Sequence, residues 1–323
     1  MMQFGLIGIG AGAAAALLFA SVSSGSFLSI ILFYLAPLPV MIAGLGWSHW
    51  AALLAAVTAT LAVAAIFGGV AVVAFVAGIA APAWWLSYLA MLGRPVPAAA
   101  NGAPASVEWY PPGRLVLWAA ALGVLLVLVA IPNFGLDAAT FRSHLSDALA
   151  TMLKVNAGAA TDHAAPDAAA RTKRLVDFMV AVVPPAAAIA ATVTNVINLW
   201  LAAKVVTFSS RLARPWPDLS SMAFPSFAAA ALAVAVAVSF AGGMAGIVAG
   251  VVTAALVVAY GILGFAVLHA ITRGQSSRPF LIGGIYASVL VFGWPLLMMT
   301  LLGVIETIFH LRARVARRRG TLV

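Results

Sequence analysis

Apolar runs of about 20 residues recur along almost the whole chain, and each is long enough to cross a hydrocarbon core about 30 Å thick. Backbone groups in lipid must hydrogen bond within their own segment, so the runs are predicted to be helices. The composition agrees, because 64% of the 323 residues are hydrophobic and 8% are charged. A transmembrane β-barrel would show segments of about 10 residues with alternating polarity, and the sequence does not alternate in this way.

The sequence therefore predicts an all-α, polytopic transmembrane helical bundle of eight to nine spans with one amphipathic interfacial helix. The nine candidate spans are about 4–22, 26–46, 49–67, 70–93, 114–132, 175–204, 222–241, 243–270 and 281–309. The expected regions are a transmembrane hairpin array (1–132), an amphipathic helix with a flexible linker (133–174), further transmembrane helices (175–311) and a basic tail (312–323).

The insertion at 133–174 separates the two sets of spans. Apolar residues recur in it at helical spacing with charged residues between them, at Phe141, Leu145, Leu149 and Met152. This pattern predicts an amphipathic helix on the membrane surface. The run from 156 to 173 is rich in Ala, Gly and Asp, and it is predicted to be a flexible linker.

Five arginines crowd the C-terminus directly after an apolar stretch, at Arg312, Arg314, Arg317, Arg318 and Arg319. The positive-inside rule predicts that this tail is cytoplasmic. The net charge of +9 then reflects membrane topology, and no nucleic-acid partner is expected. With nine spans the insertion would share the tail's side and the N-terminus would lie opposite. A break at Trp294-Pro295 would instead give eight spans, with both termini on one side.

Motifs of enzyme and metal sites are missing from the sequence. The chain has no Cys, its five His are scattered, and no phosphate-binding or nucleophile motif occurs outside an apolar run. We expect no catalytic residue, no cofactor and no metal. Asp177 and Glu306 lie in or near apolar runs, and two interpretations apply to them. They either pair with neighbouring cations, His310 in the case of Glu306, or serve a function inside the membrane.

Glycines at four-residue spacing predict faces where helices pack closely. Gly8 and Gly12 form one such face, and Gly242, Gly246 and Gly250 form another.

The sixth span combines a proline pair, Pro184-Pro185, with polar side chains at Thr194, Asn195 and Asn198. The amides either hydrogen bond between helices or line a site for a small ligand. The aromatic end of the fourth span would complete such a site with Trp84, Trp85 and Tyr88. Amides and hydroxyls avoid the cost of a buried charge, so this site would favour an uncharged or zwitterionic ligand of unknown identity.

The loop after the sixth span is predicted to be ordered, and its key residues are Arg214, Pro215, Trp216, Pro217 and Asp218. The two prolines stiffen the backbone, and Trp216 suits the membrane interface. Asp218 is expected either to cap a helix that starts near Ser220 or to pair with Arg214.

The string Asn198 to Lys204, followed by Ser210 to Met222 with its Arg-Pro-Trp-Pro-Asp run, closes on Phe224-Pro225. It resembles the YybS-like family of bacterial membrane proteins, whose function is uncharacterised. That family is distantly similar to the substrate-capture subunits of energy-coupling-factor vitamin importers and to the shape-determining protein MreD. The similarity covers roughly the first six spans.

The resemblance implies a multi-pass protein of the bacterial inner membrane. Its implied role is a non-enzymatic, transport-type subunit that captures a small molecule in the lipid bilayer and depends on membrane protein partners, since the chain has no ATPase motif. The alternative is a scaffold for partners in envelope assembly. Capture subunits dock through Ala-x-x-x-Ala faces, and Ala11 with Ala15 and Ala16 with Ala20 fit that spacing.

Overall fold

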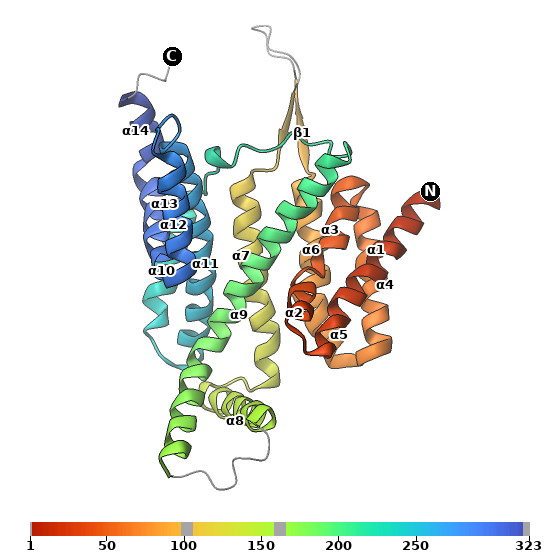
Figure 1. The fold of residues 1–323 in the computed structure, drawn as a ribbon, viewed down its shortest axis with the longest axis vertical. Coiled ribbons are helices and arrows are strands. Elements are labelled where there is room, and N and C mark those ends of the chain that lie inside the picture. Colours follow the sequence, from red (N-terminus) through yellow and green to blue (C-terminus); the bar gives the residue numbers. More distant parts are fainter. Residues whose placement is uncertain (1, 98–105, 158–165, 319–323) are drawn as a thin grey trace.

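The computed structural model describes residues 2–97, 106–157 and 166–318, and these residues are mostly helical (Figure 1). The N-terminal half contains α1 (Met2–Ala20), α2 (Phe27–Tyr34), α3 (Pro37–Gly46), α4 (His49–Phe67), α5 (Gly69–Phe75), α6 (Ala81–Ala90) and α7 (Pro112–Ala130). The remainder contains α8 (Ala138–Ala157), α9 (Pro166–Phe208), α10 (Phe227–Ser239), α11 (Gly243–Ile271), α12 (Arg278–Phe292), α13 (Pro295–Phe309) and α14 (Leu311–Arg318). An antiparallel pair of short strands, β1 (Gly93–Val96) and β2 (Ser106–Trp109), precedes α7.

Seven helical segments in the described residues are long and apolar enough to cross a membrane. They are Phe4–Ser24, Phe27–Gly46, His49–Phe67, Gly69–Ala90, Pro112–Asn133, Ala170–Phe208 and Gly243–Ile271. Three apolar helices, α10, α12 and α13, are shorter. The predicted all-α membrane fold is therefore confirmed at this level.

Of the two alternatives for 281–309, the unbroken span is wrong and the break at Trp294-Pro295 is confirmed, because the chain divides there into α12 and α13. Gly293 ends α12 with a φ of 71°, a conformation that L side chains rarely adopt, and Pro295 stands in the first turn of α13. The two helices fold back on each other, so α14 and the start of α1 lie at the same end of the bundle (Figure 1). This end also carries the strand pair, and we call it the tail end.

The sixth span is longer than predicted, since α9 runs for 43 residues with Pro184 and Pro185 inside it. Residues 166–173 are helical, so the flexible linker predicted at 156–173 is wrong there; Ala is the best helix former, and it recurs in this stretch. Residues 158–165 of that prediction lie outside the described part of the chain.

The helix α8 forms where the amphipathic pattern predicts one, at the end of the bundle opposite the tail end (Figure 1). Phe141, Leu145 and Leu149 are buried against α9 and the first turns of α11, whereas Met152 is exposed. Most of the apolar stripe of α8 therefore packs on protein.

Glycines bring some helices close together but not others. A Cβ on Gly12 would lie 2.5 Å from the carbonyl oxygen of Ala55, so the Gly8/Gly12 face packs tightly on α4 as predicted. In contrast, a Cβ on Gly242 or Gly250 would meet nothing within 4 Å, so the prediction of close packing is wrong for these two, whereas a Cβ on Gly246 would lie 3.3 Å from the carbonyl oxygen of Ser239.

Two of the alanines expected in docking faces, Ala15 and Ala16, are buried in the chain's own core. They are therefore not available to a partner in this conformation.

Candidate functional site

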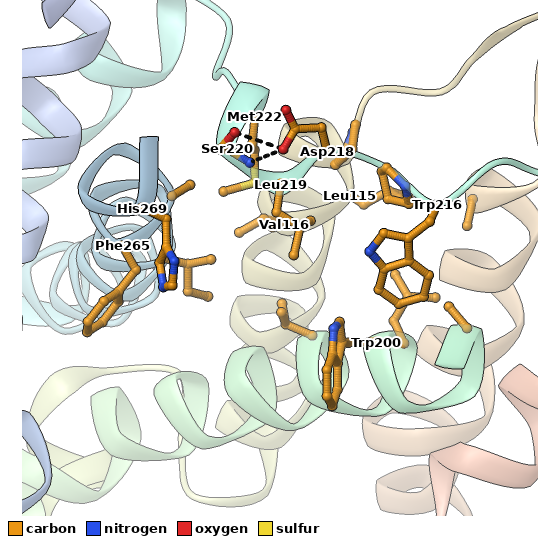
Figure 2. Close-up of a pocket in the computed structure, with 18 of the residues that line it drawn as sticks. Leu115, Val116, Trp200, Trp216, Asp218, Leu219, Ser220, Met222, Phe265 and His269 are labelled. Carbon is orange, nitrogen blue, oxygen red and sulfur yellow. Dashed lines mark hydrogen bonds between the residues drawn. The ribbon is translucent and has the colours of Figure 1, made fainter. Parts of the chain in front are cut away.

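A cavity of about 720 Å³ lies at the tail end between α7, α9, α11 and α12 (Figure 2). The loop from Leu212 to Met222 closes it on one side. Most of the wall is apolar, and Figure 2 shows Leu115, Val116 and Met222 pointing toward the space.

The loop is held in place by contacts of its own polar residues. Arg214 Nη1 donates a hydrogen bond to the carbonyl oxygen of Ala90 at 3.0 Å, which ties the loop to the end of α6. The Nζ of Lys204 lies 4.0 Å from the centre of the Trp216 ring, a cation–π distance. Four of the five predicted loop residues line the cavity; the remaining one is Pro215.

Asp218 caps the short helical turn Leu219–Ser221, because its Oδ1 accepts hydrogen bonds from the Ser220 backbone N–H at 3.0 Å and from the Ser220 hydroxyl at 2.8 Å. The capping role is as predicted. Its ion pair is with Arg273, at 2.9 Å, and not with Arg214. The bond from the Ser220 hydroxyl, together with the backbone bond and the charge of Arg273, lowers the pKa of Asp218, so this carboxylate is charged at neutral pH.

Arg214 is the unusual charge in this site, because only 8% of its surface is exposed. No carboxylate in the described residues lies within ion-pair distance of it. Burial lowers the pKa of Arg214, yet an arginine side chain stays protonated in proteins. The cavity wall therefore contains a buried positive charge whose one hydrogen bond in the described structure goes to a neutral carbonyl group.

Two further arginines, Arg273 and Arg278, also line the cavity, and Asp218 is the one carboxylate among its lining residues. His269 and Tyr286 lie beside them, with 3.3 Å between the His269 Nε2 and the Tyr286 hydroxyl. The charged groups of the wall therefore leave an excess of positive charge.

Aromatic rings supply much of the remaining wall. Trp200 and Trp216 stand on one side of the space, and Phe265 stands on the other (Figure 2). The Phe265 ring stacks on Tyr286 with 4.8 Å between ring centres. Rings of this kind hold flat apolar groups well.

The polar residues predicted for ligand binding in α9 lie on a different face of the helix. Asn195 and Asn198 are each 1% exposed, and neither they nor Thr194 line this cavity. Asn198 Nδ2 donates to the carbonyl oxygens of Tyr34 and Thr194, both at 2.8 Å. The break between α2 and α3 frees the Tyr34 carbonyl, since Leu38 N–H bonds to Leu35 instead. Asn198 thus makes a hydrogen bond between helices, which is one of the two roles predicted for the amides.

The predicted aromatic group lies outside the cavity as well. Trp84, Trp85 and Tyr88 pack on one another, with 6.2 Å between the ring centres of Trp84 and Tyr88. His49 and Trp118 extend this cluster. The structure therefore brings together the predicted loop residues, but it does not join them to the predicted amides and aromatics.

Sequence reasoning missed His269, Arg273, Arg278 and Tyr286. A weak signal was available, since these polar residues bracket the junction of two apolar runs. Their approach to Arg214 depends on tertiary packing, which no local pattern encodes.

Comparison of the chain with protein families, with curated proteins and with solved structures yields no match. Within the described residues, no group of three His, Cys, Asp or Glu side chains could hold a metal ion.

Proposed function

We propose that this chain is a membrane-embedded, transport-type capture protein that binds a small anion with an apolar or aromatic body in the cavity beside Arg214. The observation that carries the proposal is the burial of Arg214 without an anionic partner. An unpaired buried charge costs several kcal/mol, and a bound anion offsets that cost.

The ligand chemistry follows from the wall of the cavity. A guanidinium group binds a carboxylate, sulfonate or phosphate through two parallel N–H bonds, and Arg278 adds a second cation. Trp200, Trp216 and Phe265 suit the apolar part of the ligand. This proposal replaces the uncharged ligand expected at the buried amides, because the charged cavity lies elsewhere.

The orientation belongs to the same proposal. The basic residues at the tail end are Arg94, Arg114, Lys204, Arg211, Arg214, Arg273, Arg278, Arg312, Arg314, Arg317 and Arg318. Those at the opposite end are Arg142, Lys154, Arg171, Lys173 and Arg174. The positive-inside rule then favours a cytoplasmic tail end in a bacterial inner membrane. We infer eight crossings, with α10 as the shortest and α12–α13 as a hairpin that enters from the cytoplasmic side.

The sequence contains no ATPase motif, so partner subunits would supply energy for transport, as the resemblance to importer capture subunits implies. A scaffold role is the second candidate. It is favoured by α12, none of whose residues is buried although many are large and apolar. Such a helix suits contact with lipid or with another membrane protein.

Thermal unfolding of the full chain in mild detergent tests the proposed site, with benzenesulfonate as the anionic probe and benzyl alcohol as its uncharged counterpart. We expect benzenesulfonate to raise the melting temperature and benzyl alcohol to have much less effect. Arg214→Gln should weaken benzenesulfonate binding by about 10-fold or more, since hydrogen bonds to charged groups contribute about 1.5–3 kcal/mol.

Arg211→Gln is the matched control, because Arg211 directly precedes the loop but its guanidinium lies 4.8 Å from the centre of the Trp47 ring, outside the cavity. Arg278→Gln separates binding from folding, since no hydrogen bond or ion pair involves the Arg278 side chain in the described residues, and its backbone bond to Gln275 does not depend on the side chain. Equal stabilisation by the two probes would refute the proposal. Unchanged benzenesulfonate binding by the Arg214 and Arg278 variants would also refute it.

A further inference from the structure

A second cavity, of about 530 Å³, lies at the opposite end of the bundle from Arg214. Its walls come from α8, the first half of α9, and the first turns of α11 with the end of α10. None of its lining residues lines the Arg214 cavity, so its chemistry is independent of the proposed function.

One wall contains backbone carbonyl groups that lack their usual donors. Proline has no N–H, so Pro184 and Pro185 leave the carbonyls of Val180 and Ala181 without the bond from four residues ahead. For Ala181 the residue three positions ahead is also a proline, which removes the 3₁₀ alternative. Both residues line the cavity together with the two prolines. Such carbonyls in a membrane helix need donors from other groups.

The facing wall is formed mainly by glycine backbone, with Ile247 and with Ser239, whose hydroxyl donates to the Val236 carbonyl. Gly242, Gly243, Gly246 and Gly250 line it, and a Cβ on Gly250 would meet nothing within 4 Å. The nearest group to a Cβ on Gly246 is the carbonyl oxygen of Ser239, at 3.3 Å, which is an acceptor and not a donor. The neighbouring helix therefore leaves space in front of the prolines and offers no donor side chain from these positions.

Two opposite charges complete the cavity. Asp177 lies one helical turn before Ala181 on α9, and Arg142 projects from α8. The ion pair predicted for Asp177 with its basic neighbours does not form, and no ion pair involves Asp177 or Arg142 in the described residues. Ser146 supplies a hydroxyl beside Arg142.

From this arrangement we propose that the cavity binds a zwitterion that carries a primary ammonium group and an anionic oxygen group. The ammonium group donates its N–H bonds to the Asp177 carboxylate and to the Ala181 carbonyl. The anionic group receives hydrogen bonds from Arg142 and Ser146. A phosphatidylethanolamine headgroup and a free solute such as phosphoethanolamine share this chemistry.

Phosphocholine is a stringent comparison. Its quaternary ammonium group carries the same positive charge as the primary ammonium group of phosphoethanolamine, but it has no N–H to donate. Calorimetric titration of the full chain in detergent should show phosphoethanolamine binding at least about tenfold more tightly than phosphocholine. Native mass spectrometry from nanodiscs of mixed phosphatidylethanolamine and phosphatidylcholine identifies the source. If phosphatidylethanolamine is retained, the natural ligand is a lipid headgroup. If only soluble phosphoethanolamine binds, the natural ligand is a free solute.

Three variants locate the site. Asp177→Asn should weaken phosphoethanolamine binding about tenfold or more, whereas Asp147→Asn, an exposed position on α8 outside the cavity, should not. Pro185→Ala returns an N–H to the Ala181 carbonyl and should reduce the preference over phosphocholine.

Arg214→Gln should leave this binding unchanged, which separates the second cavity from the first. Equal affinity for the two probes would overturn the proposal. So would a preference for phosphoethanolamine that survives Asp177→Asn.

Discussion

Glu306 and Arg312 form the most buried ion pair in the described part of the chain, with 2.8 Å between Oε1 and Nε and side-chain exposures of 7% and 18%. Arg312 also donates a hydrogen bond to the carbonyl oxygen of Ser220, which joins α14 to the cap that Asp218 makes. One carboxylate thus holds the basic tail helix against the loop that closes the Arg214 cavity.

We predict that Glu306→Gln lowers the free energy of unfolding by about 3 kcal/mol, because Arg312 is left as an uncompensated, largely buried charge. Glu108→Gln is the control, since Glu108 pairs with Arg94 at 2.7 Å on an exposed surface. Its cost should stay below about 1 kcal/mol. Denaturant unfolding in detergent measures both, and equal costs for the two variants would contradict this account.

The local sequence predicts what these residues do better than it predicts which residues they contact. The capping role of Asp218 follows from a polar residue placed before Ser220, which is a local signal. The predicted ion pairing of Glu306 is confirmed, but the partner is Arg312 of the tail and not His310, which adopts a left-handed backbone with a φ of 51° that ends α13. The turn brings Arg312 back toward Glu306, and spacing along one helix could not reveal that.

At the scale of helices, α11 and α13 pack so closely that glycine is required at their contact. A Cβ on Gly264 would overlap the backbone of Met299, and one on Gly303 would overlap the carbonyl of Tyr260. Thr300 adds a hydrogen bond from its hydroxyl to the Val257 carbonyl at 2.8 Å. Hydropathy alone gives one long span here because both helices are apolar throughout, and it was the Trp294-Pro295 pair that indicated the alternative, a break.

We predict that Gly264→Ala destabilises the protein by about 1–3 kcal/mol, the usual cost of overpacking a close contact. Gly283→Ala in α12 should be neutral or stabilising by up to about 1 kcal/mol, because no atom lies within 4 Å of its added methyl group. Melting temperatures of the two variants in one detergent provide the comparison. A Gly264 variant as stable as the Gly283 variant would show that the two helices are not packed in this way.

Across the whole molecule, the positions of the seven membrane-length helical segments in the described residues follow from the sequence, because hydrocarbon thickness sets the length of each apolar run. The side of the membrane on which each end of the bundle lies does not follow as directly from the sequence. With nine spans the sequence places the insertion at 133–174 on the tail's side, whereas the structure has the break that was weighed as the alternative and puts α8 at the opposite end (Figure 1). The hairpin of α12 and α13 accounts for the difference, because it returns the chain to the side from which it entered.

Cysteine labelling tests this arrangement cleanly, since the chain has no Cys of its own. Ser143→Cys on α8 and Ser209→Cys at the tail end occupy exposed positions at opposite ends of the bundle. In intact cells, an impermeant maleimide should label Ser143→Cys and should reach Ser209→Cys only after permeabilisation. Labelling of both positions in intact cells would contradict the topology.

The central claim is that a buried arginine at the tail end is completed by an anion from outside the chain. Mass spectrometry of small molecules retained after gentle purification tests it most directly, with the wild-type protein and the Arg214→Gln and Arg211→Gln variants prepared side by side. The account predicts an amphipathic anion that is retained by the wild type and by Arg211→Gln and lost from Arg214→Gln. Equal retention by all three proteins, or a retained ligand without negative charge, would contradict it.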